Sequence, residues 1–218
     1  YVPRSKISSR VTADVTITPD DTPSSITIPK NYSIRTTIDS VTYNFITDTA
    51  ITIKNNGGVY VANNVTFYEG ELVTEVFTAN VTTNSDGSYN SYGYIISSEN
   101  VDVNSIEVSV KNSASDTTTT VFTKADNFFG VTSESNKFFV EGYKSNQYRI
   151  IFGNDVIGKA LKNGNVVTVT YRDTVGELAN KATSFTKTSS IDGYSSIALN
   201  IQSASYGGAD RESNTDIT

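Results

Sequence analysis

The regular alternation of apolar and polar residues limits this chain to a strand-rich fold. In the segment SRVTADVTIT, every second residue is apolar and the residues between are polar. The apolar positions are Val11, Ala13, Val15 and Ile17. Because successive side chains of a strand point to opposite faces, such a segment forms a half-buried strand. The chain is also rich in β-branched residues and Tyr, and poor in Ala and Leu. We therefore predict an all-β protein with very little helix, built as two sandwich-like β-rich lobes.

Turn-forming Asn, Asp and Gly residues divide the chain into short strands. The clearest turns are at 39–40, 55–58, 69–70 and 163–164. Strands are predicted within 9–18, 24–30, 31–47, 50–54, 59–82, 104–125, 137–153, 164–174 and from 197 onward. The polar segment 82–93 is the expected junction. The first lobe is therefore predicted to comprise residues 1–90 with 176–218, and the second residues 91–175.

The composition excludes several kinds of chemistry. The chain has no Cys and no His, so it can form neither a disulfide, a thiolate zinc site nor a Ser-His-Asp triad. Its net charge is −6 without a long basic run, which disfavours nucleic-acid binding. No apolar run approaches the roughly 20 residues that span a bilayer. We expect no enzymatic activity, no cofactor, no metal site, no nucleic acid and no membrane among its partners.

The start of the sequence, YVPRSKISSR, lacks an apolar signal core and does not begin with Met. We expect the chain to be a piece of a longer protein.

One segment nearly matches a nucleotide-binding loop. Gly153, Gly158 and Lys159 have the spacing G-x-x-x-x-G-K, but Ala160 stands where Ser or Thr would hold Mg²⁺. A phosphate loop also needs a following helix, whose N-terminal N–H groups wrap the phosphates. Here the turn signal at Gly164 and a β-branched strand follow at once. We therefore interpret the segment as a connection between two strands.

Other polar and aromatic groups can be interpreted either as functional sites or as structural features. The acid pairs at 20–21, 69/71 and 210/212 could bind Ca²⁺ or act as acid and base, but acids in turns are usually solvated. Sequons at Asn31, Asn64 and Asn80 arise easily in an Asn- and Thr-rich chain. The tyrosines of segment 89–94 could bind glycans or pack across strands. An adhesin-like glycan-binding module is therefore the alternative function, and a carboxylate-based or nucleotide-hydrolysing enzyme is a third class.

Several motifs occur together in a fixed order. IPKNYSIRTTIDSVTYNFIT and VTFYEGELVTEVFTAN precede FGNDVIGKALKNGNVVTVTY, which is followed by a T-x-G-x-x-A-N turn and by GGADRES. The positions concerned are Phe152, Gly153, Asn154, Gly158, Lys159, Leu161, Gly164, Asn165, Val167, Val169, Tyr171, Thr174, Gly176, Ala179, Asn180, Gly207, Gly208, Asp210, Glu212 and Ser213. In this combination the chain resembles the baseplate wedge proteins of contractile-tailed bacteriophages, the J-like baseplate family that includes the T-even wedge subunit. The resemblance covers most of residues 26–218 apart from the loop around Asp86.

The resemblance implies a structural protein of the virion. Such proteins pair as dimers in each wedge, bind neighbouring wedge proteins in the tail baseplate, and hold no known cofactor. The residues it marks as interface or turn-setting are Phe152, Gly153, Gly158, Lys159, Gly164, Gly207, Gly208, Asp210 and Glu212. Asn154 departs from the usual Asp-Gly of the family, which we expect to change only the local turn. The sequence also ends soon after GGADRES, where family members usually continue into helices and further domains.

Overall fold

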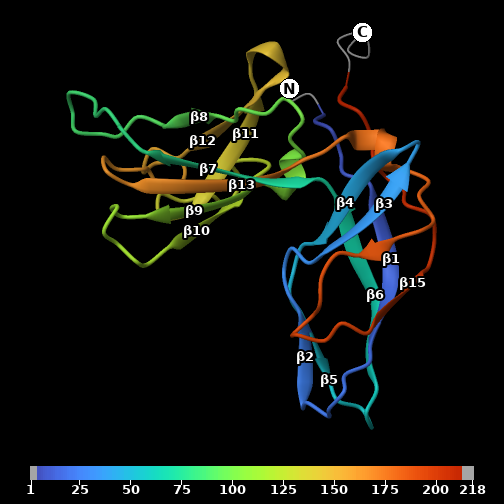
Figure 1. Cartoon of the computed structure of the whole chain (residues 1–218). Coiled ribbons are helices and arrows are strands. Elements are labelled where there is room, and N and C mark those ends of the chain that lie inside the picture. Colours follow the sequence, from blue (N-terminus) through green and yellow to red (C-terminus); the bar gives the residue numbers. More distant parts are fainter. Residues whose placement is uncertain (1–3, 213–218) are drawn as a thin grey trace. The chain divides into compact units, whose positions relative to one another are not determined.

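The structure, a computed structural model, describes residues 4–212 as an almost entirely β protein (Figure 1). The strands are β1 (Arg10–Ile17), β2 (Ser25–Ile28), β3 (Ser33–Ile38), β4 (Val41–Thr47), β5 (Ile51–Lys54), β6 (Tyr60–Glu69), β7 (Glu71–Thr78), β8 (Gly93–Ile95), β9 (Glu107–Lys111), β10 (Thr120–Lys124), β11 (Lys137–Gly142), β12 (Tyr148–Phe152), β13 (Val166–Asp173), β14 (Thr186–Lys187) and β15 (Ile197–Ile201). Helical structure in the described residues is limited to three short 3₁₀ turns, η1 (Val103–Ser105), η2 (Lys144–Asn146) and η3 (Gly176–Ala179). The predicted all-β class is confirmed.

The chain forms two compact units. Lobe A comprises Lys6–Glu71 and Thr174–Arg211, and lobe B comprises Leu72–Asp173 with residues 4–5 and Glu212 among the described chain ends. Each lobe has its own sheet and its own hydrophobic core.

Lobe A is built on a six-stranded sheet in the order β14-β3-β4-β6-β1-β15, with β2 and β5 as a separate pair (Figure 1). The pairings that define its order and register are antiparallel. The alternation read from the sequence decides which side chains are buried: Val11, Ala13 and Val15 are fully inaccessible, while the residues between them are half-buried. The sheet curls, so that its edge strands β14 and β15 come near each other.

Lobe B is built on a seven-stranded sheet in the order β7-β13-β9-β10-β11-β12-β8. The pairs β13–β9, β9–β10, β11–β12 and β12–β8 are antiparallel, whereas β10 and β11 are parallel. The inward-facing residues of β12 and β13, including Ile150, Phe152, Val167 and Val169, are fully buried in its core. This sheet also curls into a barrel-like form rather than lying flat.

The chain passes from lobe A to lobe B after Glu71 and returns after Asp173. The return lies beside the expected boundary at residue 175. The first passage comes earlier than the expected boundary at residue 90, because β7 is a neighbour of β13 in the lobe B sheet. The segment after β7 also belongs there, since Ala79 N donates to Asn165 O over 2.8 Å.

Candidate functional site

Two glycine-containing turns that are distant in sequence interlock in lobe A. We call Thr174–Asn180 with Gly207–Asp210 the glycine turn pair. A Cβ atom on Gly208 would overlap the carbonyl oxygen of Gly176. At Gly176, where φ is +72°, a Cβ atom would lie 2.6 Å from Asp210 Oδ1 and 2.9 Å from Ala209 O. Both glycines are therefore required for close approach of two backbones.

Asn180 joins the two turns by a pair of hydrogen bonds. Its Nδ2 donates to Gly208 O and its Oδ1 accepts from Gly208 N, both over 2.9 Å. A side-chain amide can make this double contact because it carries a donor and an acceptor together. The sequence-predicted residues Gly208 and Asp210 thus lie against the T-x-G-x-x-A-N turn.

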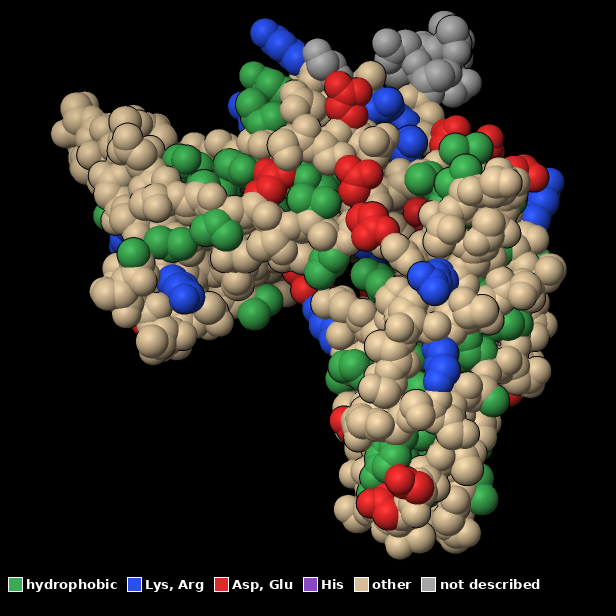
Figure 2. All heavy atoms as spheres, viewed as in Figure 1, with side chains coloured by type: hydrophobic (Ala, Val, Ile, Leu, Met, Phe, Trp, Pro, Cys, Tyr) green, Lys and Arg blue, Asp and Glu red, His purple; other side chains and the backbone are tan. Residues whose placement is uncertain are grey.

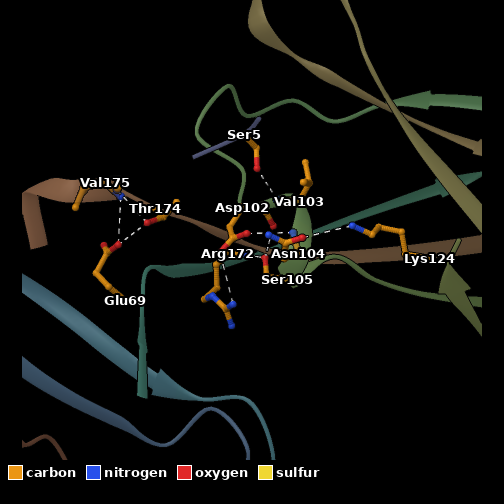
Figure 3. A network of polar contacts seen from close by, with 11 residues as sticks. Ser5, Glu69, Asp102, Val103, Asn104, Ser105, Lys124, Arg172, Thr174 and Val175 are labelled. Carbon is orange, nitrogen blue, oxygen red and sulfur yellow. Dashed lines mark hydrogen bonds and ion pairs between the residues drawn. The ribbon is translucent and has the colours of Figure 1, made fainter. Parts of the chain in front are cut away.

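A buried carboxylate supports this arrangement from below the turn (Figure 3). Glu69 is only 3% exposed, and its Oε2 accepts from Thr174 Oγ1 over 2.5 Å and from Val175 N over 3.3 Å. Thr174 Oγ1 in turn accepts from Gly176 N over 3.1 Å. The expectation that the acids at 69 and 71 are solvated is wrong for Glu69, whereas Glu71 is exposed.

The segment around Gly207 continues as an antiparallel partner of the N-terminal segment of lobe A. Backbone bonds join Ile7 to Ala209 and Arg10 to Tyr206 in both directions. The Arg10 guanidinium also lies 4.8 Å from the centre of the Tyr206 ring, within the range of a cation–π contact. Gly207, with φ of +81°, lies between the two bridges, at a backbone angle that glycine adopts without strain.

Glu212 does not share this site with Asp210. It belongs to lobe B, where its backbone N donates to Arg4 O over 3.1 Å and its Oε2 accepts from Arg4 N over 3.0 Å. The acid pair 210/212 is thus divided between two local environments.

In lobe B, the segment from Gly153 to Ala160 forms a closed loop. Gly153 and Ala160 form a parallel bridge, and a Cβ atom on Gly153 would overlap the backbone of Gly158. Asn154 Oδ1 accepts from the next turn, at Ile157 N, over 3.0 Å. Phe152, immediately before the loop, is fully buried in the lobe B core. Phe152 anchors the loop, and the two glycines allow its close backbone contact.

The N–H groups of this loop are already used within the protein. Gly158 N donates to Thr132 O over 3.1 Å, and Lys159 N donates to Ser135 O over 2.9 Å. Ala160 N donates to the Asp155 carboxylate over 2.7 Å. A phosphate loop would present these groups to its ligand at the start of a helix, but a turn follows here. The geometry is that of a connection between strands, with Gly164 in an exposed turn at φ of +86°.

The two edge strands of the lobe B sheet, β7 and β8, are joined by side chains. We call Glu75, Phe77, Tyr92, Tyr94 and Tyr171 the aromatic seam. The Phe77 ring stacks on Tyr94 at 4.0 Å between centroids and on Tyr92 at 5.7 Å, with planes within 11° of parallel. Aromatic side chains thus join the two edge strands of the sheet.

Glu75 is the polar centre of the aromatic seam. Its Oε2 accepts from Tyr94 OH over 2.6 Å. Its Oε1 accepts from Tyr171 OH over 2.6 Å and from the Ser97 hydroxyl and N–H over 2.5 and 3.2 Å. One carboxylate therefore connects β7, β13 and the end of β8. Nothing in the sequence pattern singled out Glu75, although it lies on the same side of β7 as the half-buried Val73 and Phe77.

These contacts shift the acidities of the seam residues in opposite directions. Burial raises the Glu75 pKa, but the hydrogen bonds from Ser97, Tyr171 and Tyr94 outweigh it, so the pKa falls below its ordinary value of 4.5. Burial and the bond to Glu75 raise the pKa of Tyr171 from 10.0 to about 12. The same two causes raise the pKa of Tyr94. The seam therefore favours an ionised acid beside two neutral phenols.

The tyrosines of segment 89–94 have intramolecular partners. Tyr92 and Tyr94 use ring faces and a hydroxyl in the aromatic seam, while Tyr89 lies under the Lys162 ammonium at 5.0 Å. The glycan-binding alternative stays a prediction that these contacts do not favour.

A buried ion pair in lobe B was also missed from the sequence. Asp102 and Arg172 are 3% and 6% exposed, with Arg172 NH2 3.7 Å from Asp102 Oδ2 (Figure 3). Arg172 N donates to Ser105 Oγ over 2.8 Å, and Asp102 N donates to Arg172 O over 3.0 Å. Arg172 is on the side of β13 that carries Thr168 and Thr170, so the alternation predicts an exposed side chain. Arg172 is nevertheless buried.

Backbone and uncharged side chains cover most of the face shown in Figure 2, and Lys and Arg are scattered there. Within residues 4–212, no three or more Asp and Glu side chains are grouped as a metal site would require. No helix in the described part of the chain is long and apolar enough to cross a membrane. No model of a known protein family matches the sequence, and no curated protein is significantly similar to it. The resemblance to baseplate wedge proteins therefore rests on the motifs themselves.

Proposed function

We propose that this chain is a structural component of the baseplate wedge of a contractile-tailed bacteriophage. Its function is protein–protein assembly in the virion, with other wedge proteins as partners and a homodimer in the intact protein. The interlocked turns give it rigid surfaces on which neighbouring subunits dock.

The observation that carries this proposal is the glycine turn pair. Two motif elements of the resemblance, T-x-G-x-x-A-N and GGADRES, are about thirty residues apart in sequence, yet Gly208 lies against both Gly176 and Asn180. The residues of both motifs fix the close approach of two backbone segments, which is the role expected of conformational residues in a structural protein. Their side chains serve the fold, with the Asn180 amide bonded to backbone and Glu69 buried beneath the turn.

The test is reconstitution of the wedge. The intact protein that contains this chain is co-expressed with the other tail proteins of its phage, and complexes are separated by size-exclusion chromatography. We expect the protein to co-elute in a wedge complex at fixed stoichiometry. Its absence from every complex of tail proteins would contradict the proposal.

A matched pair of glycine variants tests the part played by the turn. In Gly208→Ala the added Cβ meets the Gly176 carbonyl, whereas in Gly93→Ala it meets the flexible side chain of Arg149 at 3.1 Å. We expect Gly208→Ala to lower incorporation into the complex and Gly93→Ala to leave it near the parent level. Equal incorporation of both variants would show that assembly does not depend on the turn.

A further inference from the structure

The sequence contains two Asn-Gly dipeptides, Asn56-Gly57 and Asn163-Gly164, in different chemical environments. We propose that Asn56 is a site of spontaneous deamidation through a succinimide, and that Asn163 is protected from the same reaction. This inference concerns covalent modification and does not depend on the proposed function.

The reaction needs only the chain and water. The Gly57 backbone nitrogen, losing its proton to solvent base, attacks Cγ of Asn56, and the side-chain amide leaves as ammonia. Water then opens the five-membered succinimide at either carbonyl, giving Asp or isoaspartate. Glycine as the second residue favours the ring closure because it has no Cβ to crowd the nitrogen.

Asn56 lies at the hairpin turn that joins β5 to β6 (Figure 1). Its backbone pairs with Val59 in both directions, over 3.3 and 3.1 Å, leaving Gly57 and Gly58 as the two-residue loop. Asn56 is exposed, and a Cβ on Gly57 would have no atom within 4 Å. In the described part of the chain, no hydrogen bond occupies the Asn56 side chain or the Gly57 N–H.

The side chain of the preceding residue, Asn55, is fully engaged in hydrogen bonds. Asn55 Nδ2 donates to Pro23 O over 3.1 Å and to Tyr60 OH over 2.6 Å, while its Oδ1 accepts from Gly58 N over 2.8 Å. The turn is therefore held by Asn55, and Asn56 is left free to react.

Asn163 is exposed like Asn56, so accessibility does not separate the two sites. The difference is in the reacting groups. Asn163 Oδ1 accepts from Val81 N over 2.5 Å, which holds the side-chain amide in place. The attacking nitrogen, Gly164 N, donates to Ala79 O over 3.1 Å. Ring closure at Asn163 must break both bonds, whereas at Asn56 it breaks neither.

The products would change the turn in two ways. Either product adds a negative charge to a chain whose net charge is −6. Isoaspartate also inserts an extra backbone carbon beside Gly57, and the two-residue loop, with φ of +62° and +86° at its glycines, has no spare length for it.

The test compares the two sites within one sample. The folded chain is aged in mildly alkaline buffer, digested, and analysed by mass spectrometry for Asp and isoaspartate at residues 56 and 163. We expect Asn56 to deamidate several-fold faster than Asn163 in the folded chain. In urea, where the bonds to Val81 and Ala79 are absent, the two rates should become similar.

Two outcomes would overturn the inference. One is a folded chain in which Asn163 reacts as fast as Asn56 or faster; the other is a rate difference that persists unchanged in urea. The variant Gly57→Ala supplies the chemical control, because its Cβ crowds the attacking nitrogen and should slow the reaction at Asn56 while leaving that at Asn163 unchanged.

Discussion

Individual carboxylates hold parts of this protein together in ways that their sequence context conceals. Glu69 and Glu71 are two residues apart, yet Glu69 is buried under Thr174 while Glu71 is exposed and accepts from Asn44 over 2.7 Å. Glu75, on the same stretch of chain, collects hydrogen bonds from three residues. Glu69 is on the same side of β6 as the buried Phe67, and Glu75 is on the same side of β7 as the half-buried Phe77. Their hydrogen-bond partners come from distant segments, so the local sequence does not reveal them.

Removing the charge of Glu75 should loosen the aromatic seam. Gln at this position keeps the shape, but it loses the charge-assisted bonds from Tyr94, Tyr171 and Ser97. We expect Glu75→Gln to destabilise lobe B by about 1–3 kcal/mol, seen as faster hydrogen exchange of β7 and β8. Glu71→Gln, at an exposed acid, should stay within about 0.5 kcal/mol. Equal effects of the two substitutions would contradict the assigned role of Glu75.

The seam should also respond to pH at both extremes. Since the Glu75 pKa is lowered on folding, its contribution is full above the ordinary value of 4.5 and is lost as the pH falls through the folded value. Since the pKa of Tyr171 is raised to about 12, its contribution is full below 10.0 and is lost as the pH rises toward 12. Hydrogen exchange of β8 should therefore be slowest between these limits. In Glu75→Gln the rise of β8 hydrogen exchange at low pH should disappear. If this rise is unchanged in the variant, a group other than Glu75 causes it.

At the scale of elements, the sequence predicted strands and turns well. The period-two pattern identified β1 and β13, and the turns at 39–40, 55–58 and 69–70 lie between the expected strands. Asp39 and Ser40 take φ of 49° and 68°, as a two-residue hairpin demands. Neighbouring residues in the sequence determine these strands and turns, so the sequence pattern predicts them. The meeting of Gly176 with Gly208 could not be predicted in this way, because it depends on how two separated segments pack.

The glycine turn pair should tolerate no side chain at Gly176. Gly176 and Gly193 both have positive φ, +72° and +88°, so Ala costs about 1–2 kcal/mol of backbone strain at either. Only at Gly176 does the new Cβ also meet Asp210 Oδ1, at 2.6 Å, whereas nothing lies within 4 Å at Gly193. Thermal unfolding should therefore show a larger loss of stability for Gly176→Ala, and equal losses would argue against the close contact.

The Gly153 loop offers a similar comparison in lobe B. A Cβ on Gly153 would overlap the Gly158 backbone, while a Cβ on Gly164, where φ is +86°, would have no atom within 4 Å. We expect Gly164→Ala to cost about 1–2 kcal/mol from its backbone angle alone. Gly153→Ala should cost more, because the loop must open to admit it. Urea unfolding of the two variants checks the order, and a milder Gly153→Ala would contradict the loop geometry.

At the scale of the whole molecule, the sequence predicted two β-rich lobes, but strand pairing decides which strands belong to each. β7 follows β6 after a single glycine, and its alternation is like that of its neighbours, yet it pairs with β13 in the other sheet. Likewise, β1 has β15 as a neighbour although most of the chain separates them. Partners at such sequence distances leave no trace in local periodicity, which explains the difference at the first boundary.

Because each lobe has its own core, a cavity in one should weaken that lobe first. Phe67 in lobe A and Phe138 in lobe B are both fully buried. We expect Phe67→Ala and Phe138→Ala each to cost about 3–5 kcal/mol. Hydrogen exchange followed by mass spectrometry should show increased exchange in the substituted lobe. An equal increase over both lobes for either variant would show that the chain unfolds as one cooperative unit.

The chain leaves lobe A for lobe B and later returns to lobe A, and this path has a consequence for biosynthesis. Residues Leu72–Asp173 form a continuous stretch, whereas lobe A needs Lys6–Glu71 and also Thr174–Arg211. On the ribosome, where chains emerge from the N-terminus onward, β1 appears early but its neighbour β15, at Ile197–Ile201, appears late. The lobe whose strands are made first is therefore the last to be completed, and until then one side of β1 is open to other strands.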